Sequence, residues 1–217
     1  MPLEADSVTI TFQGESAGYD NSLGWFKLDE DGNPTDPQMI WSNTDEGELS
    51  EGTSVTLEGL APGEQFGFFI VKDGADEYPW LEGQQDSSNT MQFGEDGGIE
   101  FVNNGGNVTH SMDADDLFFT NESMNPDGIN HALSGIEGEE LMIGFEDLTG
   151  GGDNDFNDVT FSVKYENEVS SQPTSDSFKF TAEDGDGVVV ADNDDTGGDG
   201  YTVTDGQGTF DITIDNT

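Results

Sequence analysis

The stretch LMIGFEDLTGGGDNDFNDVTFSVKY, residues 141–165, contains the patterns that decide the fold. Apolar side chains at Val159, Phe161, Val163 and Tyr165 alternate with polar ones, and this period of two is typical of a half-buried β-strand. A second apolar run, LMIGF, begins the stretch, and five carboxylates and three consecutive glycines lie between the two runs. The sequence therefore predicts two strands connected by a flexible, strongly acidic loop.

The same alternation recurs along the chain, whereas helical periodicity does not. Residues 8–12 and 210–214 alternate in this way. The run FGFFIV, residues 66–71, is apolar on both faces, which indicates a central strand covered on both sides. Turns rich in Gly, Asn and Asp separate these runs. Many short strands with such turns predict an all-β protein, a β-sandwich or jelly roll with long glycine- and aspartate-rich loops.

A domain boundary is expected at ENEVSSQPTSDS, residues 166–177, a polar stretch that follows the strand at 159–165. We predict a β-sandwich domain over residues 1–167 and a short additional β segment over 168–217. That segment is small for an independent core. It is either part of a neighbouring module or a set of strands that completes the sandwich, with strands expected near residues 178–180, 188–191, 201–203 and 210–214.

The charge balance restricts the function. The chain has 48 acidic residues against 4 basic ones and a formal net charge of −44. Nucleic acids and anionic membrane surfaces require clusters of Lys and Arg, so neither is an expected partner. Disordered acidic chains lack aromatic residues in patterned runs, whereas this chain has 15 Phe, 3 Trp and 4 Tyr, many of them in such runs, so a folded chain is expected. Bound divalent cations or high external salt would relieve the self-repulsion of a compact chain.

Cysteine is absent, which excludes disulfides, thiolate nucleophiles and cysteine ligands for zinc. No apolar run is long enough to span a bilayer, and the first ten residues lack the pattern of a signal peptide. We therefore expect no membrane insertion, and we interpret the sequence as a monomeric module within a longer chain.

The acidic loop offers the ligands that Ca²⁺ prefers. Calcium takes six to eight oxygen ligands from carboxylates, Asn side chains and backbone carbonyls, whereas Mg²⁺ uses fewer protein ligands. Three consecutive glycines allow the chain to fold back with positive φ. We predict several bound Ca²⁺ ions. The residues predicted to hold metal in this loop are Glu146, Asp147, Asp153, Asp155, Asn157 and Asp158. The alternative is a solvated acidic loop without an ion.

A second candidate is the turn DEDGNPTD, residues 29–36, where Asp29 and Asp31 could hold another ion or form a plain turn. Neither this turn nor the acidic loop has the residue spacing of an EF-hand, because Pro34 and Asp158 occupy the position of the turn glycine.

GFEDLTGGGDNDFNDVTFSV resembles the signature of a calcium-dependent β-sandwich family from large bacterial surface proteins, including the RTX adhesins. The signature is F-E-D-L, three glycines, D-x-D, an aromatic residue and N-D, followed by an alternating strand. SAGYDNSLGWFKLDEDG (16–32), APGEQFGFFIVKDG (61–74) and DGINHAL (127–133) are supporting features. The likeness covers roughly residues 5–166.

This resemblance implies an extracellular module on the bacterial cell surface that captures extended peptide segments, often by a free C-terminus, for adhesion and biofilm formation. It implies that Glu146, Asp147, Asp153, Asp155 and Asp158 are ion ligands. It also implies that the triple glycine shapes an adjoining groove. The residues that we assign to ligand binding there are Gly150, Gly151, Gly152 and Asn154.

Two other classes of function stay open beside peptide capture. Tyr78 and Trp80, which follow the turn KDGADE, could form an exposed platform for a glycan, although tryptophans are more often buried. Calcium could also serve only to rigidify a structural spacer. An enzyme is not predicted, because the chain has no G-x-S-x-G elbow, and acid pairs occur in any acid-rich sequence. We expect His131 to pack beside a strand and to form hydrogen bonds.

Overall fold

The strand expected at residues 159–165 is β12 (Val159–Glu166), which lies at the centre of a five-stranded antiparallel sheet. The computed structural model describes residues 7–45, 47–57, 59–61, 64–82, 90–138 and 140–166, and the backbone of three strands within residues 179–213. The order of the first sheet is β10 (Ala132–Glu137), β11 (Glu140–Phe145), β12, β1 (Ser7–Gly14) and β4 (Ser54–Leu57).

The second sheet is built around β5 (Gln65–Val71), the strand expected to be covered on both sides. On one side, β5 pairs with β2 (Ser22–Leu28), which pairs with β3 (Pro34–Trp41). On the other side, it pairs with β9 (Leu117–Phe119) and β15 (Gly208–Thr213). Strands β13 (Lys179–Asp184) and β14 (Ala191–Asp192) continue this sheet beyond β15.

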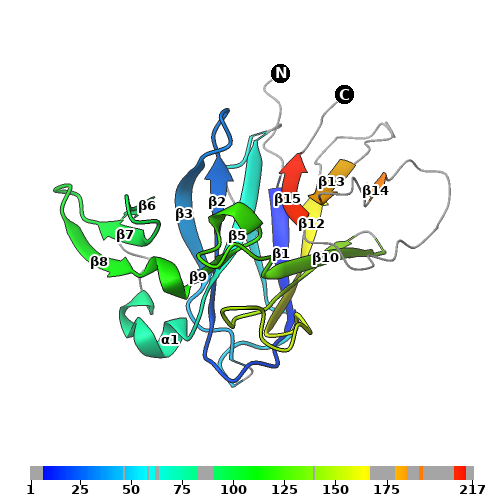
Figure 1. The fold of residues 1–217 in the computed structure, drawn as a ribbon, viewed down its shortest axis with the longest axis horizontal. Helices are drawn as coiled ribbons and strands as arrows, with labels where there is room; N and C mark the ends of the chain where they lie inside the picture. The colour runs from blue at the N-terminus through cyan, green and yellow to red at the C-terminus, as the bar shows by residue number, and fades with distance from the viewer. Residues whose placement is uncertain are drawn as a thin grey trace.

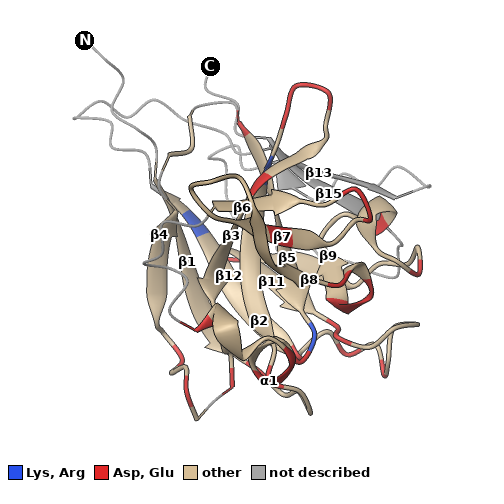
Figure 2. Cartoon of the chain, turned by 90° about the vertical axis from the view of Figure 1, so that its left-hand side faces the viewer, with Lys and Arg blue, Asp and Glu red and all other residues tan. Residues whose placement is uncertain are grey.

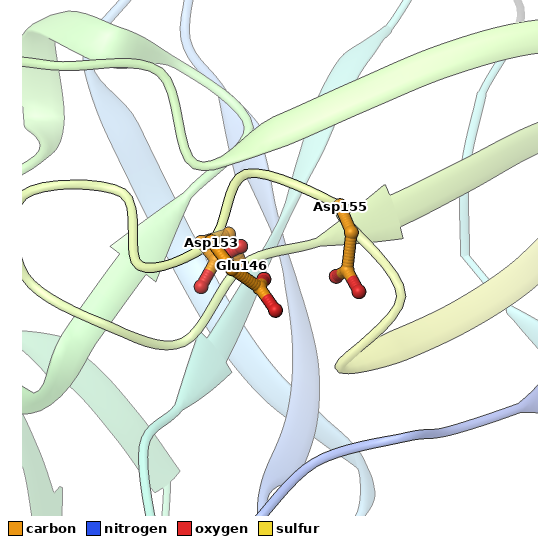
Figure 3. Close-up of side chains that lie close together, drawn as sticks. All are labelled: Glu146, Asp153 and Asp155. Carbon is orange, nitrogen blue, oxygen red and sulfur yellow. The ribbon is translucent and has the colours of Figure 1, made fainter.

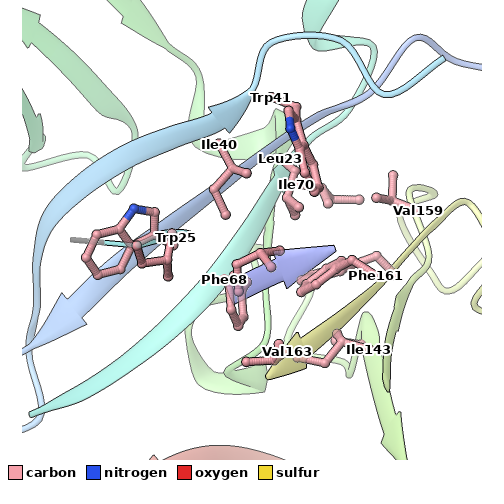
Figure 4. Close-up of a cluster of buried hydrophobic side chains, with 14 of the residues drawn as sticks. Leu23, Trp25, Ile40, Trp41, Phe68, Ile70, Ile143, Val159, Phe161 and Val163 are labelled. Atoms are coloured by element: carbon pink, nitrogen blue, oxygen red, sulfur yellow. The ribbon is translucent and has the colours of Figure 1, made fainter. Parts of the chain in front are cut away.

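The two sheets pack face to face around a shared core, and Figure 1 shows how their strands are arranged. The inward side chains of β1, β11 and β12 meet those of β2, β3 and β5 in one hydrophobic core. Phe68 of β5 contacts Phe161 of β12 with ring centroids 4.9 Å apart, so the aromatic rings span the space between the sheets (Figure 4). The predicted all-β sandwich is confirmed.

A second core covers the opposite face of β5 and explains why its sequence is apolar on both faces. Phe69 and Val71 face β6 (Thr90–Phe93), β7 (Ile99–Val102) and β8 (Val108–Met112), a three-stranded sheet that the sequence analysis did not assign. Gly67 is required at the crowded centre, because an added Cβ would lie 2.6 Å from the Phe26 ring.

Helix is confined in the described residues to α1 (Gly74–Glu77) and to three-residue 3-10 turns. The 3-10 turns are η1 (Pro79–Leu81), η3 (Ala114–Asp116) and η4 (Glu122–Met124). None of these is long and apolar enough to cross a membrane.

The C-terminal strands adjoin the sandwich, since Ile212 of β15 pairs with Phe66 of β5. This is the arrangement expected if the last strands complete the sandwich, and the domain boundary itself stays a prediction. The strand expected at residues 201–203 lies outside the described residues, as do parts of those expected at 178–180, 188–191 and 210–214.

Candidate metal centre

The acidic loop connects β11 to β12, and the ends of both strands fix its first and last carboxylates. Glu146 directly follows β11, and its N–H donates to the His131 carbonyl at 2.9 Å. Asp158 directly precedes β12, and its N–H donates to the Phe145 carbonyl at 3.1 Å. The side chain of Asp158 then reaches back across the loop, because its Oδ2 accepts from the Asp147 N–H at 2.8 Å.

Five of the predicted metal ligands converge in this loop. Oxygens of Glu146, Asp153 and Asp155 lie within 4.8 Å of one another, and the same is true of Glu146, Asp147 and Asp158. Glu146 belongs to both groups. Figure 3 shows the first group, in which the three carboxylates point to the same side of the loop. We call these five residues the carboxylate cage.

Burial makes the negative charge of the central carboxylates of the cage unfavourable. Glu146 is 1% exposed and Asp147 is 2% exposed. Burial, reinforced by the charges of Asp158 and Asp153, raises the pKa of Glu146 to about 7. Burial also raises the pKa of Asp147 to about 6, although a hydrogen bond from Asn21 opposes this shift. The pKa of Asp158 is raised for the same first reason, and the charge of Asp155 adds to it. A group of carboxylates in this condition gains free energy when a cation neutralises it.

The glycines of the loop are required by close contacts as well as by backbone conformation. Gly150, Gly151 and Gly152 have φ of +83°, +83° and +46°. A Cβ at Gly152 would overlap Oε1 of Glu146, and a Cβ at Gly144 would overlap the Phe156 carbonyl. The glycines thus allow the loop to pass directly over the shared carboxylate.

Two asparagines of the loop hydrogen-bond within the cage. Asn154 has φ of +59°, and its N–H donates to Oε2 of Glu146 at 3.1 Å. Asn157 Nδ2 donates to Oδ2 of Asp155 at 2.8 Å. The predicted roles of Asn157 as a metal ligand and of Asn154 in ligand binding stay predictions.

Two buried residues outside the loop, Asn21 and His131, and the half-buried Asp127 hold the cage and were not predicted as part of the site. Asn21 Nδ2 donates to Oδ2 of Asp147 at 2.7 Å. His131 has no exposed surface, stacks on Phe118 at 3.9 Å, and places Nδ1 2.9 Å from the Glu146 carbonyl. Its Nε2 lies 2.9 Å from Oδ2 of Asp127. The packed, hydrogen-bonded role expected for His131 is therefore confirmed. The motifs YDNSL and DGINHAL were the available signal for these positions.

Comparison with known proteins adds one match. A family model described as a domain of unknown function, DUF4114, matches residues 60–166. The matched range includes the whole acidic loop, Asp127 and His131. It covers just under half of the 217 residues, and the description assigns no activity. No curated protein and no solved structure matches the chain.

Asp29 and Asp31 lie outside the matched range and outside both groups of converging carboxylates. Asp29 Oδ1 accepts from the N–H groups of Asp31 at 2.9 Å and Asn33 at 2.8 Å. Hydrogen bonds, first from the Asn33 side chain and then from turn N–H groups, lower the pKa of Asp29. These contacts are those of a turn that caps itself, and the predicted role of Asp29 and Asp31 as metal ligands stays a prediction.

Tyr78 and Trp80 lie within the matched range but belong to the second core. The Tyr78 hydroxyl donates to Oδ2 of Asp116 at 2.7 Å, and burial raises the pKa of that hydroxyl. Trp80 packs edge-on against Phe101 at 4.8 Å and stacks on His110 at 4.6 Å. Both side chains are half-buried, so each offers less surface to a glycan than a freely exposed ring would.

Acidic residues are common elsewhere and do not single out the cage by number. Figure 2 shows Asp and Glu spread over many loops and turns, whereas the strands carry little charge. The cage differs from these other acids in that its central carboxylates are buried and share a small volume.

Proposed function

We propose that the carboxylate cage binds Ca²⁺ and that the protein folds to full stability only with the ions in place. The observation that carries this proposal is the convergence of two carboxylate groups on the buried Glu146. Two groups that share one carboxylate suit more than one ion. With metal bound, the carboxylates would supply oxygen ligands, and the ions would neutralise the mutual repulsion of these side chains.

The donor set favours calcium over other metals. All five cage residues are carboxylates, so the site offers hard oxygen ligands and neither sulfur nor imidazole, which suit zinc and copper. Mg²⁺ keeps several of its waters and takes only one or two protein carboxylates, whereas Ca²⁺ accepts many oxygens in flexible geometry.

We further propose that the cage supports a peptide-binding surface of an extracellular bacterial adhesion module. Three large hydrophobic side chains are exposed among the described residues, namely Tyr19, Val108 and Leu148. Leu148 directly follows Asp147 of the cage, and Tyr19 lies two residues before Asn21, which donates to Asp147. The exposed apolar side chain of Leu148, next in sequence to the cage, suits an extended peptide that presents an apolar side chain next to an oxygen ligand.

The test is capture of ligand with and without Ca²⁺. We expect immobilised protein to retain members of a random peptide library with free C-termini in about 2 mM Ca²⁺ and to release them in chelator. A glycan array probed under both conditions separates peptide binding from carbohydrate binding. If neither library is retained while Ca²⁺ still raises the thermal midpoint, the peptide proposal is wrong, and the role of calcium is to rigidify a structural spacer.

A further inference from the structure

One aspartate outside the acidic loop connects the glycine turn of the loop to the rest of the domain. Oδ2 of Asp127 accepts from the Gly150 N–H at 2.8 Å and lies 2.9 Å from His131 Nε2. Asp127 thus joins the first glycine of the acidic loop to the residue that precedes β10. Its side chain is 15% exposed, and that of His131 is fully buried.

His131 completes the connection to the shared carboxylate. Its Nδ1 faces the Glu146 carbonyl at 2.9 Å, and its own carbonyl accepts from the Glu146 N–H at 2.9 Å. Glu146 is therefore held on both sides of its backbone by one residue, and the Phe118 ring fixes the plane of that residue's imidazole.

The segment that bears Asp127 is itself fixed. Asn125 accepts from the Phe119 N–H at 2.6 Å and donates to the Ile129 carbonyl at 2.8 Å. The Ile129 N–H lies 3.3 Å from Oδ1 of Asp127. Ile129 also adjoins Gly151, where an added Cβ would lie 3.3 Å from its Cδ1. A rigid segment on one side of the acidic loop therefore sets the position of its glycine turn.

We propose that Asp127 and His131 are positioning residues for cation binding: they hold Gly150 and Glu146 at the separation that lets Asp153 and Asp155 approach Glu146. This inference rests on the proposed function, because it concerns the affinity of the cage for Ca²⁺. Partners that orient the ligands of a metal, without contacting the metal, typically change its affinity 10- to 100-fold when they are removed.

The experiment is calorimetric Ca²⁺ titration of the full chain and three variants at low ionic strength. Asp127→Ala is expected to bind Ca²⁺ about 10- to 100-fold more weakly than the natural chain. Asp127→Asn keeps one carbonyl oxygen for Gly150 and is expected to recover part of that loss. Asp96→Ala is the matched control, because it also removes one negative charge and one turn acceptor: Oδ1 of Asp96 accepts from the Gly98 N–H at 3.1 Å in the β6–β7 hairpin.

Two further readouts separate positioning from folding. The thermal midpoint in chelator is expected to be similar for Asp127→Ala and Asp96→Ala, while amide hydrogen exchange at Gly150 is faster only in Asp127→Ala. Equal Ca²⁺ affinity of Asp127→Ala and Asp96→Ala would overturn the inference and leave the proposed function intact. Absence of Ca²⁺ binding by the natural chain would overturn both.

Discussion

The acidic loop between β11 and β12 and the turn between β2 and β3 have similar compositions but opposite electrostatics. In the turn, Asp29 is exposed, and amides of the same turn lower its pKa. In the loop, burial, followed by the charges of neighbouring carboxylates, raises the pKa of Glu146 to about 7. Local N–H groups satisfy the charge of the turn, whereas the loop gathers more charge than its own hydrogen bonds offset. The difference shows that the burial and convergence of acids, and not their number, mark a candidate cation site.

Removing the shared carboxylate should have the largest effect on this contrast. Because Glu146 belongs to both groups, Glu146→Ala is expected to weaken Ca²⁺ binding by at least about 100-fold, which is a loss of roughly 2.7 kcal/mol or more. Asp29→Ala is expected to leave the affinity unchanged. Calorimetric titration of both variants checks this, and equal affinities would place the cation site elsewhere.

Acidification is expected to have the next largest effect. Protons compete with Ca²⁺ for Glu146 and Asp147, whose pKa values are about 7 and about 6. Affinity should therefore fall roughly 10- to 100-fold between pH 7.5 and about pH 5.5. A titration series across this range tests the expectation, and an affinity independent of pH would contradict it.

Without Ca²⁺, the same pKa shifts act on stability in the opposite direction: Ca²⁺ affinity falls as the pH is lowered, whereas the stability of the chelated protein rises. A carboxyl group whose pKa is raised by folding stabilises the protein below its ordinary pKa of 4.5, and this contribution is lost as the pH rises through about 7. The chelated protein should therefore have a lower thermal midpoint at pH 7.5 than at about pH 5.5. The lowered pKa of Asp29 acts in the other direction, since its contribution is lost only as the pH falls through that pKa.

A glycine substitution in each region should give the smallest difference. Gly152→Ala adds a Cβ that overlaps Glu146, at a φ of +46°, whereas Gly32→Ala meets no atom within 4 Å at a φ of +81°. Both variants carry backbone strain of about 1 kcal/mol. Only Gly152→Ala is expected to displace a cage residue, with roughly tenfold weaker Ca²⁺ binding. Chemical unfolding in chelator and Ca²⁺ titration separate the two contributions.

The sequence was informative wherever a local pattern determines the structure. Strict alternation located β1 and β12, and the two-sided apolar run at residues 66–71 located β5 between two cores. The order of acids and glycines between two strands identified all five cage residues, because strand ends hold flanking side chains in place.

Long-range partners were not predictable in the same way. Asn21 lies 126 residues before Asp147, and no local pattern shows that the two side chains meet. The third sheet was missed because its strands are short and β8 is exposed at four of its five positions. Composition alone also does not show that Asp29 accepts hydrogen bonds from its own turn, because that depends on the backbone conformation of the turn.

The most direct test of the central claim is the thermal midpoint of the natural chain at pH 7.5 in low salt, measured in chelator and in excess Ca²⁺. If the cage binds Ca²⁺, a free concentration of about 100 times the dissociation constant stabilises the folded state by roughly 2.7 kcal/mol per site, so the midpoint should rise by several degrees. The same concentration of Mg²⁺ should raise it less. An identical midpoint in chelator and in Ca²⁺ would contradict the account.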